Sequence, residues 1–243
     1  MTSSNYLLKK IFKSSEALKK SPHFMFESSS INIFLNNFSY LQLKEKNIDF
    51  NNFDNIFCDG ILLASLASNK IGKKISRVSF DETSLAFEWL NFGIQENMNV
   101  LIIGATQEEN DKFIGLIKQS LNINEKNIKG LNGYDLDIND ISLDDAGSYL
   151  IIIGLGSPLQ EKFALSLKRK YKNLEKKLII FTCGGFISQT SRSQNAGLSY
   201  YPRIVNLLNI RWLYRFLKEE HTFVRTIFNY PRSIIKFILN EYY

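Results

Sequence analysis

A glycine-rich turn near the middle of the chain has the residue types of an anion-binding site. The segment Gly154–Phe163 follows the apolar run Tyr149–Ile153 and opens a helical pattern. Its glycines allow close approach of a ligand, Ser157 can cap the helix, and Pro158 suits the first helical position. The free N–H groups and the helix dipole favour a phosphate, although such a turn can also be purely structural. A dinucleotide fingerprint needs glycine or alanine where Leu159 stands, so an NAD site is disfavoured.

The same order of apolar strand, polar or glycine turn and helix recurs along the chain. Other short apolar runs end at or next to Asn36, Asp59, Gly104, and the pair Gly184 and Gly185. This alternation predicts an α/β fold of the Rossmann-like type, with a mainly parallel sheet and flanking helices. Ligands of such sheets bind beyond the carboxyl ends of the strands. We therefore expect these residues and Gly156 to lie along one rim.

Length and composition agree with one α/β domain and an appendage. The chain has 243 residues, of which 44% are hydrophobic, and no apolar stretch approaches the roughly 18 residues of a membrane span. Lysines interrupt the first 20 residues, which therefore lack the apolar region of a signal peptide, and we expect a cytoplasmic protein. Cys58 and Cys183 each end a predicted strand, which favours packed thiols over a disulfide or metal pair.

The net charge of +6 is concentrated at the two ends of the chain. Residues 1–20 carry five lysines against one glutamate, and residues 201–243 carry seven lysines and arginines against three glutamates. Both ends also hold large apolar residues, a composition that favours an anionic membrane surface. The alternative is a helical tail that packs on the domain with its cations in water. We expect a basic N-terminal segment (1–20), a core (21–200) and a membrane-associating helical appendage (201–243).

Several motifs together resemble the WecG/TagA/CpsF glycosyltransferases, family 26 of that enzyme class. They are Asp59-Gly60, Arg77–Ser84, Gly133-Tyr134, Gly154–Phe163 and Arg211–Arg215, in order over about residues 30 to 232. Thr182–Thr190 and Tyr200-Tyr201-Pro202 are similar to the branch that acts in bacterial surface polysaccharide synthesis.

The resemblance implies transfer of a sugar, with inversion, from a UDP-sugar to a polyprenyl-diphosphate-linked glycan acceptor. It places the enzyme on the inner face of the cell membrane, and the sugar is of the N-acetylmannosamine type or a hexose. No cofactor is implied, and a homo-oligomer is allowed. Two alternatives remain, a non-catalytic nucleotide- or membrane-binding protein and another nucleotide-dependent enzyme. Nucleic acid is disfavoured because the middle of the chain is near neutral and carries no nucleic-acid motif.

Asp59 is the candidate catalytic base. An inverting transfer needs a group that takes the proton of the acceptor hydroxyl, and a carboxylate at a strand end before a glycine is suitably placed. The resemblance assigns the base to the same residue, while the alternative is a cap for the helix that follows. Asp81 is a rival base, but the segment Ser79–Ser84 is more typical of a capping box.

Arginines are better candidates than a metal for stabilising the leaving diphosphate. His23 and His221 have no partner at ligand spacing, and Asp135-Leu136-Asp137 is the only Asp-x-Asp, so we expect a metal-independent enzyme. The guanidinium fork matches a diphosphate. The resemblance places such arginines at Arg215 and Arg225; Thr222 replaces a third, for which Arg211 or Lys218 can substitute.

The remaining substrate contacts are predicted at strand ends. Asn36 resembles an asparagine on the acceptor side of the family's cleft, but asparagine is also common in turns. Gln160 is the preferred donor contact through its amide, and Glu161 is either a contact or a favourable first-turn acid. The glycines 104, 156, 184 and 185 are predicted to approach the nucleotide, with a plain turn as the alternative for each.

Overall fold

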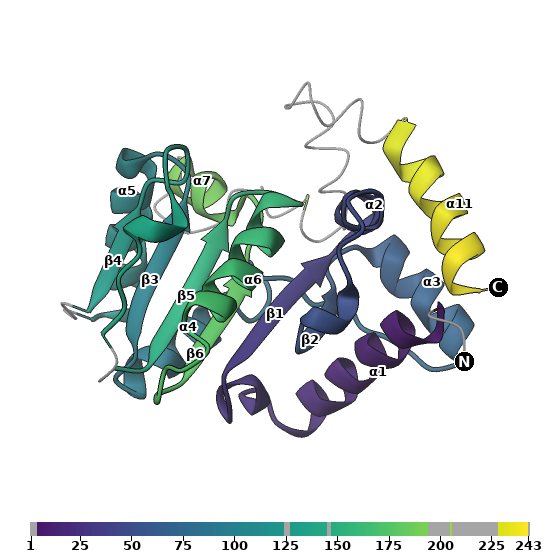
Figure 1. Cartoon of the computed structure of the whole chain (residues 1–243), viewed down its shortest axis with the longest axis horizontal. Coiled ribbons are helices and arrows are strands. Elements are labelled where there is room, and N and C mark those ends of the chain that lie inside the picture. Colours follow the sequence, from purple (N-terminus) through teal and green to yellow (C-terminus); the bar gives the residue numbers. More distant parts are fainter. Residues whose placement is uncertain (1–3, 124–126, 145–146, 194–204, 206–227, 243) are drawn as a thin grey trace.

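A six-stranded, all-parallel sheet forms the centre of the computed structural model (Figure 1), which describes residues 4–123, 127–144, 147–193, 205 and 228–242. The strand order is β2-β1-β6-β5-β3-β4. The strands are β1 (Ser30–Leu35), β2 (Asn55–Cys58), β3 (Asn99–Gly104), β4 (Ile128–Leu131), β5 (Tyr149–Gly154) and β6 (Leu178–Thr182). The prediction of an α/β fold with a parallel sheet is confirmed.

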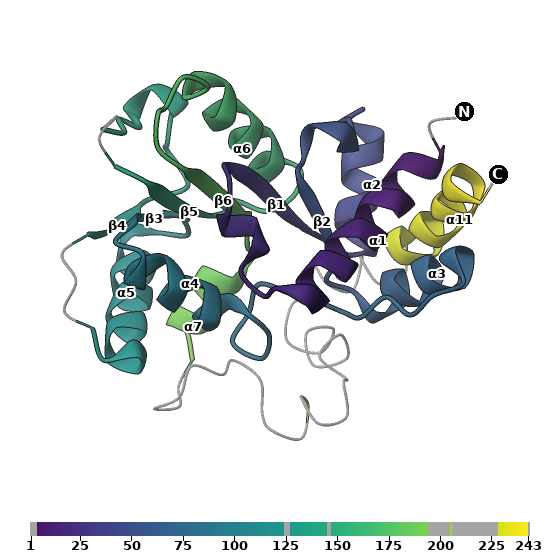
Figure 2. The same cartoon turned by 90° about the horizontal axis from the view of Figure 1, so that it is seen from below.

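Helices cover both faces of this sheet (Figure 2). One layer contains α1 (Ser4–Lys20), α2 (Asn37–Glu45), α3 (Ile61–Ile71), α6 (Leu159–Lys170) and α11 (Tyr230–Glu241). The other contains α4 (Ala86–Gln95), α5 (Gln107–Leu121) and α7 (Phe186–Ser191). Short 3-10 helices are η1 (Phe24–Phe26), η2 (Phe50–Asn52) and η3 (Ile138–Asp140).

The strands are apolar along their length because both faces of the sheet are buried. In β3, Leu101 and Ile103 join the cluster under α1, α3 and α6, whereas Val100 and Ile102 join the cluster under α4 and α5. Parallel sheets covered on both faces have such continuous apolar runs. The apolar segments from which the strands were predicted thus contribute side chains to two separate hydrophobic clusters, one on each face of the sheet.

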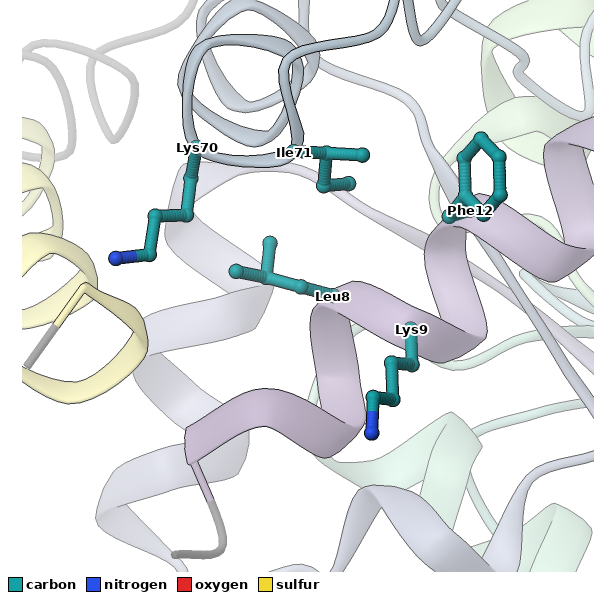
Figure 3. A pocket seen from close by; sticks show the side chains of 5 residues that line it. All are labelled: Leu8, Lys9, Phe12, Lys70 and Ile71. Atoms are coloured by element: carbon teal, nitrogen blue, oxygen red, sulfur yellow. The ribbon is translucent and has the colours of Figure 1, made fainter.

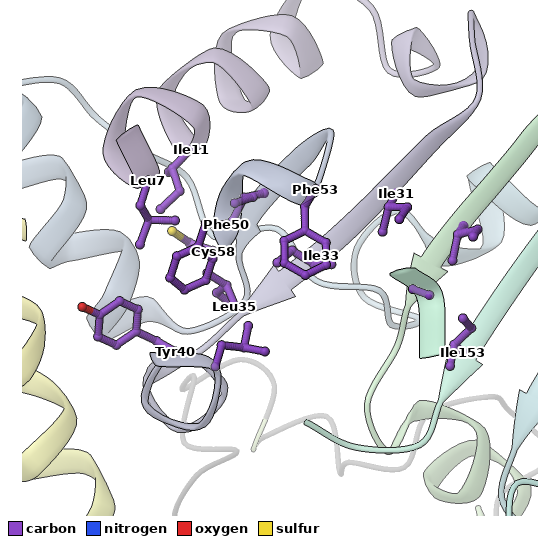
Figure 4. Close-up of a cluster of buried hydrophobic side chains, with 14 of the residues drawn as sticks. Leu7, Ile11, Ile31, Ile33, Leu35, Tyr40, Phe50, Phe53, Cys58 and Ile153 are labelled. Carbon is purple, nitrogen blue, oxygen red and sulfur yellow. The ribbon is translucent and has the colours of Figure 1, made fainter. Parts of the chain in front are cut away.

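Helix α1 is part of the domain core. Leu7, Leu8 and Ile11 are at most 3% exposed, and Figure 4 shows Leu7 and Ile11 directed toward the cluster that contains Phe50. The hydroxyl of Ser14 accepts a hydrogen bond from the backbone N–H of Ile56 in the edge strand β2 (3.1 Å). The buried face of α1 therefore packs into the domain core, while the division between segment 1–20 and the core stays a prediction.

The C-terminal helix α11 packs on α2 and α1. Phe237 is fully buried, and the buried carboxylate of Glu241 contacts Lys44 Nζ (2.8 Å) and accepts from the Tyr40 hydroxyl (3.1 Å). The hydroxyl of Tyr242 donates to the carbonyl of Leu66 on α3 (2.8 Å). The last turns of the predicted appendage are thus joined to the core, while residues 206–227 lie outside the described part.

A small hollow of about 200 Å³ lies between α1 and α3 (Figure 3). It is lined by Leu8, Lys9, Phe12, Lys70 and Ile71. Its lining includes no carboxylate, hydroxyl or amide side chain and none of the strand-end residues that the sequence singled out. Among the described helices, none has the length and apolar composition that crossing a membrane requires.

Candidate active site

A cavity of about 880 Å³ lies at the carboxyl edge of the sheet. Its walls come from the segments that follow β1, β2, β5 and β6, from the segment between α3 and α4, and from Tyr230 at the start of α11. Strand β1 is followed in the chain by β2, its neighbour on one side in the sheet. Strand β6 is the neighbour of β1 on the other side, and it is followed by α7, which packs on α5. The cavity therefore occupies a topological switch point, where open α/β sheets bind their ligands.

Asp59 lies in the cavity wall directly after β2. Its side chain is 33% exposed, and its backbone N–H donates to the carbonyl of Leu35 at the end of β1 (2.7 Å). The N-cap position of α3 belongs to Gly60, which makes no side-chain cap. Asp59 does not occupy the position that the capping alternative requires, and its carboxylate reaches the cavity.

Arg77 holds Asp59 at two points. Its Nε donates to the backbone carbonyl of Asp59 (2.7 Å), and its Nη2 contacts Oδ1 of the same residue (3.2 Å) and Oδ2 of Asp81 (3.0 Å). Burial alone lowers the pKa of the guanidinium, but the two carboxylates outweigh burial and raise the pKa above its usual value. Arg77 therefore carries a fixed positive charge beside Asp59.

Sequence reasoning used Arg77 only as part of a motif and missed its place in the site. A signal was present in the alternation of Arg77, Ser79 and Asp81 with the apolar residues Val78 and Phe80, which are both buried. Such alternation is typical of an extended segment with one polar face. The N–H of Val78 donates to the carbonyl of Cys58 (2.8 Å), which brings this polar face to the end of β2.

Asp81 closes a turn in the same wall. Its Oδ1 accepts from the N–H (2.9 Å) and hydroxyl (2.8 Å) of Thr83, and its Oδ2 accepts from the hydroxyl of Ser79 (2.7 Å). Helix α4 begins later, with Leu85 at its N-cap. The expected capping box is therefore wrong for Asp81, which caps a turn and also contacts Arg77.

Three of the four predicted glycines line the cavity, namely Gly156, Gly184 and Gly185. Gly156 (φ +72°) and Gly184 (φ +58°) have left-handed backbones that favour glycine, and both face open space. Gly104 is not among the cavity residues; a Cβ there would lie 2.5 Å from the carbonyl oxygen of Gly154 in β5. Close packing of two strand ends therefore gives the glycine at 104 a structural reason.

Gln160 and Glu161 join the turns that follow β5 and β6. Oε1 of Gln160 accepts from the N–H of Gly184 (3.0 Å), and its Nε2 donates to Oε1 of Glu161 (3.0 Å). The Ser157 hydroxyl donates to the same Glu161 oxygen (2.7 Å). Gln160 lines the cavity with an amide already engaged, whereas Glu161 is fully buried and does not line it. The geometry shows Glu161 as a buried acceptor for Ser157 and Gln160.

Asn36 takes the turn role that was its alternative. Its Oδ1 accepts from the N–H of Ser39 (3.0 Å), and the Ser39 hydroxyl accepts from the N–H of Asn36 (2.9 Å), which completes a capping box for α2. Asn36 still lines the cavity, and so does the buried Asn37. Within the described residues, Nδ2 of Asn37 has no hydrogen-bond partner.

The predicted arginines Arg211, Arg215 and Arg225 lie outside the described residues, as does Thr222. In the Asp-x-Asp triplet, Asp137 caps η3 by accepting from the N–H of Asn139 (2.7 Å), and neither aspartate of the triplet lines the cavity. Across the part that the structure describes, no three His, Cys, Asp or Glu residues are grouped so that they could hold a metal ion.

The all-parallel sheet, the cavity at its switch point and the carboxylate held at a strand end define an α/β enzyme of the doubly wound type. The model of the glycosyl transferase WecG/TagA/CpsF family matches residues 11–242, and the chain belongs to this family. A curated relative from Shigella boydii is 35% identical over 215 residues, which cover 84% of each chain. That relative is named UDP-Gal:alpha-D-GlcNAc-diphosphoundecaprenol beta-1,4-galactosyltransferase. The chain is therefore a glycosyltransferase.

Proposed function

We propose that this enzyme transfers a hexose, with inversion, from a UDP-sugar to a sugar linked to polyprenyl diphosphate in bacterial surface polysaccharide synthesis. The observation that carries the proposal is the carboxylate of Asp59 in the wall of the switch-point cavity, held by Arg77. The named activity of the Shigella boydii relative supports both substrate classes. UDP-galactose is accordingly the first donor to test, with an N-acetylmannosamine-type donor second.

Asp59 acts as general base in this proposal. Its carboxylate takes the proton of the acceptor hydroxyl while the hydroxyl oxygen forms a bond to the anomeric carbon. The bond from that carbon to the UDP oxygen breaks on the opposite face, and its electron pair leaves with UDP. The configuration at the anomeric carbon is therefore inverted in a single displacement.

The donor diphosphate fits best near the turns after β5 and β6. Gly156, Gly184 and Gly185 line that side of the cavity, and their lack of a Cβ permits close approach of a ligand. We assign the developing charge on UDP to the backbone N–H groups of these turns and to the family arginines Arg211, Arg215 and Arg225. Gln160 contributes by holding the turn at Gly184.

The acceptor lipid fits the opposite rim. Ile61 (54% exposed) and Leu62 (41% exposed) lie on the first turn of α3, beside Asp59, and both line the cavity. Exposed apolar residues at a binding site suit the isoprenoid part of the acceptor. In this proposal the acceptor hydroxyl lies beside Asp59, and the exposed apolar rim supports peripheral docking on the inner face of the cell membrane.

Transfer is expected to be independent of a metal. Of the three carboxylates in the described cavity wall, Asp59 and Asp81 contact Arg77, the third being Glu82, and Asp137 is used as a cap. Turnover should therefore persist in excess EDTA. Loss of turnover on chelation and its recovery with Mg²⁺ or Mn²⁺ would assign the diphosphate charge to a metal instead of arginine.

The decisive assay measures UDP release from a panel of UDP-sugars with a polyprenyl-diphosphate-linked N-acetylglucosamine as acceptor. Asp59→Asn should lower turnover by about 10² or more, the scale of a lost general base, while UDP affinity is kept. Asp135→Asn is the matched control, because Asp135 is exposed and lies outside the cavity. Near-normal turnover of Asp59→Asn would remove Asp59 from the role. UDP binding without transfer from any donor would favour the non-catalytic alternative.

A further inference from the structure

Asp81 contacts the same guanidinium nitrogen as the proposed base. Nη2 of Arg77 lies 3.2 Å from Oδ1 of Asp59 and 3.0 Å from Oδ2 of Asp81. All three side chains lie in the wall of the cavity. One cation is therefore shared by two carboxylates beside the reacting hydroxyl.

Asp81 is held by the turn in which it lies. Its side chain is 17% exposed, against 33% for Asp59. Both of its oxygens accept hydrogen bonds from the surrounding turn, from Ser79 on Oδ2 and from Thr83 on Oδ1. Asp81 therefore fixes the end of the Arg77 side chain, and Arg77 in turn fixes the backbone and carboxylate of Asp59.

The sharing also sets the charge around Asp59. A guanidinium paired with Asp59 alone would stabilise the carboxylate strongly and make it a poor proton acceptor. A second carboxylate on the same nitrogen opposes this effect, because its negative charge disfavours the ionised form of Asp59. A base of moderate strength is the better catalyst near neutral pH.

We propose that Asp81 is a positioning residue of the transfer reaction, which acts through Arg77 to orient Asp59 and to offset the guanidinium charge. The inference rests on the proposed function, since it assumes that Asp59 is the base. The other titratable side chains of the described cavity wall are Glu82, Cys183 and Tyr230, and Cys58 directly precedes Asp59 in the chain. Burial raises the pKa of the Cys58 thiol to about 12, so this group stays neutral across the working range.

The test measures kcat/KM against pH for wild type and two variants with opposite expected effects. Asp81→Asn keeps an oxygen for Thr83 but removes the negative charge. The acidic limb of the pH profile, which reports the pKa of the base, should therefore move to lower pH by about one unit. The rate above the limb should fall about 3- to 10-fold, because the base is weaker. Arg77→Gln removes the shared cation, so its acidic limb should move up.

Two further variants separate charge from structure. Thr83→Val removes a hydroxyl that donates to Asp81 without changing any charge, and its limb should stay at the wild-type position. Asp81→Glu keeps the charge and should return the limb most of the way toward wild type. If a thermal melt shows that Asp81→Asn does not fold, the limb shifts of Arg77→Gln and Asp81→Glu decide the question.

The outcomes also distinguish the inference from the proposed function. A wild-type protein without transfer activity, or an Asp59→Asn variant with full activity, would overturn the function. A different result would overturn only the role of Asp81. In that result transfer depends on Asp59, but the acidic limbs of Asp81→Asn and Arg77→Gln coincide with that of wild type or move in the same direction.

Discussion

Glu161 combines full burial with a carboxylate that is only half satisfied. Its Oε1 accepts from Ser157 and Gln160, while Oε2 has no partner within the described residues. Burial raises the pKa of this carboxyl above its usual value. The acid is therefore a structural link between the β5 and β6 turns that tolerates ionisation poorly.

We expect Glu161→Gln to stabilise the protein at alkaline pH. An acid whose pKa is raised by folding gives stability that is complete below the unfolded pKa and is lost as pH rises through the folded pKa. Glutamine keeps the accepting oxygen and cannot ionise. In urea titrations, the free energy of unfolding of the variant should exceed that of wild type at pH 8 and approach it at pH 4. Glu108→Gln, at an exposed first-turn position of α5, is the control. A difference that does not change with pH would rule out ionisation as the cause.

Individual residues show where prediction from sequence succeeds. Asp59 was placed correctly at the rim, because a polar residue after a parallel strand lies at the carboxyl edge whatever the rest of the fold. Arg77 lies 18 residues further along, and its contact depends on a loop that returns to β2, which no local pattern encodes. Gly104 shows a different limit, since packing against Gly154 and approach of a ligand both require glycine.

Among the elements, α11 has two unlike faces. Phe237 is fully buried against α2, whereas Ile235 and Leu239 are 60% and 62% exposed. The amphipathic pattern of the C-terminal end fitted both membrane contact and packing on the domain. Periodicity predicts the apolar stripe of a helix but not what covers it, and here the core covers part of it.

Phe237→Ala should destabilise the protein by about 3 to 5 kcal/mol, the usual cost of removing a buried phenylalanine. Chemical denaturation measures this loss, and the matched control is Leu239→Ala on the exposed face of the same helix. The control should change the free energy of unfolding by no more than about 0.5 kcal/mol. Equal, small effects in both variants would mean that α11 is not an integral part of the fold.

At the scale of the whole molecule, charge and exposed apolar surface coincide at the C-terminal end. Residues 201–243 carry a formal charge of +4, and Phe228, Ile235 and Leu239 are exposed there. Each cation near an anionic surface contributes roughly 1 kcal/mol, and salt weakens this attraction. These features support the proposed docking on the membrane.

The double variant Ile235→Ser and Leu239→Ser should lose retention on vesicles of phosphatidylglycerol and phosphatidylcholine, with an unchanged melting temperature. The reason is that both side chains face solvent, so their loss removes apolar contact with lipid but little packing. Co-sedimentation measures retention, and Tyr134→Ser, which replaces an exposed aromatic residue after β4, is the control. Full retention of the double variant would remove α11 from the docking surface.

The first and last helices of the chain, α1 and α11, lie side by side (Figures 1 and 2). Leu7, Leu8 and Ile11 therefore share a cluster with Phe237, although α1 and α11 lie far apart in the sequence. Contacts between segments this distant in sequence form slowly, because the loop between them must close first. A folding intermediate without this contact would leave the apolar faces of both helices exposed, and such exposed surface makes intermediates prone to aggregation.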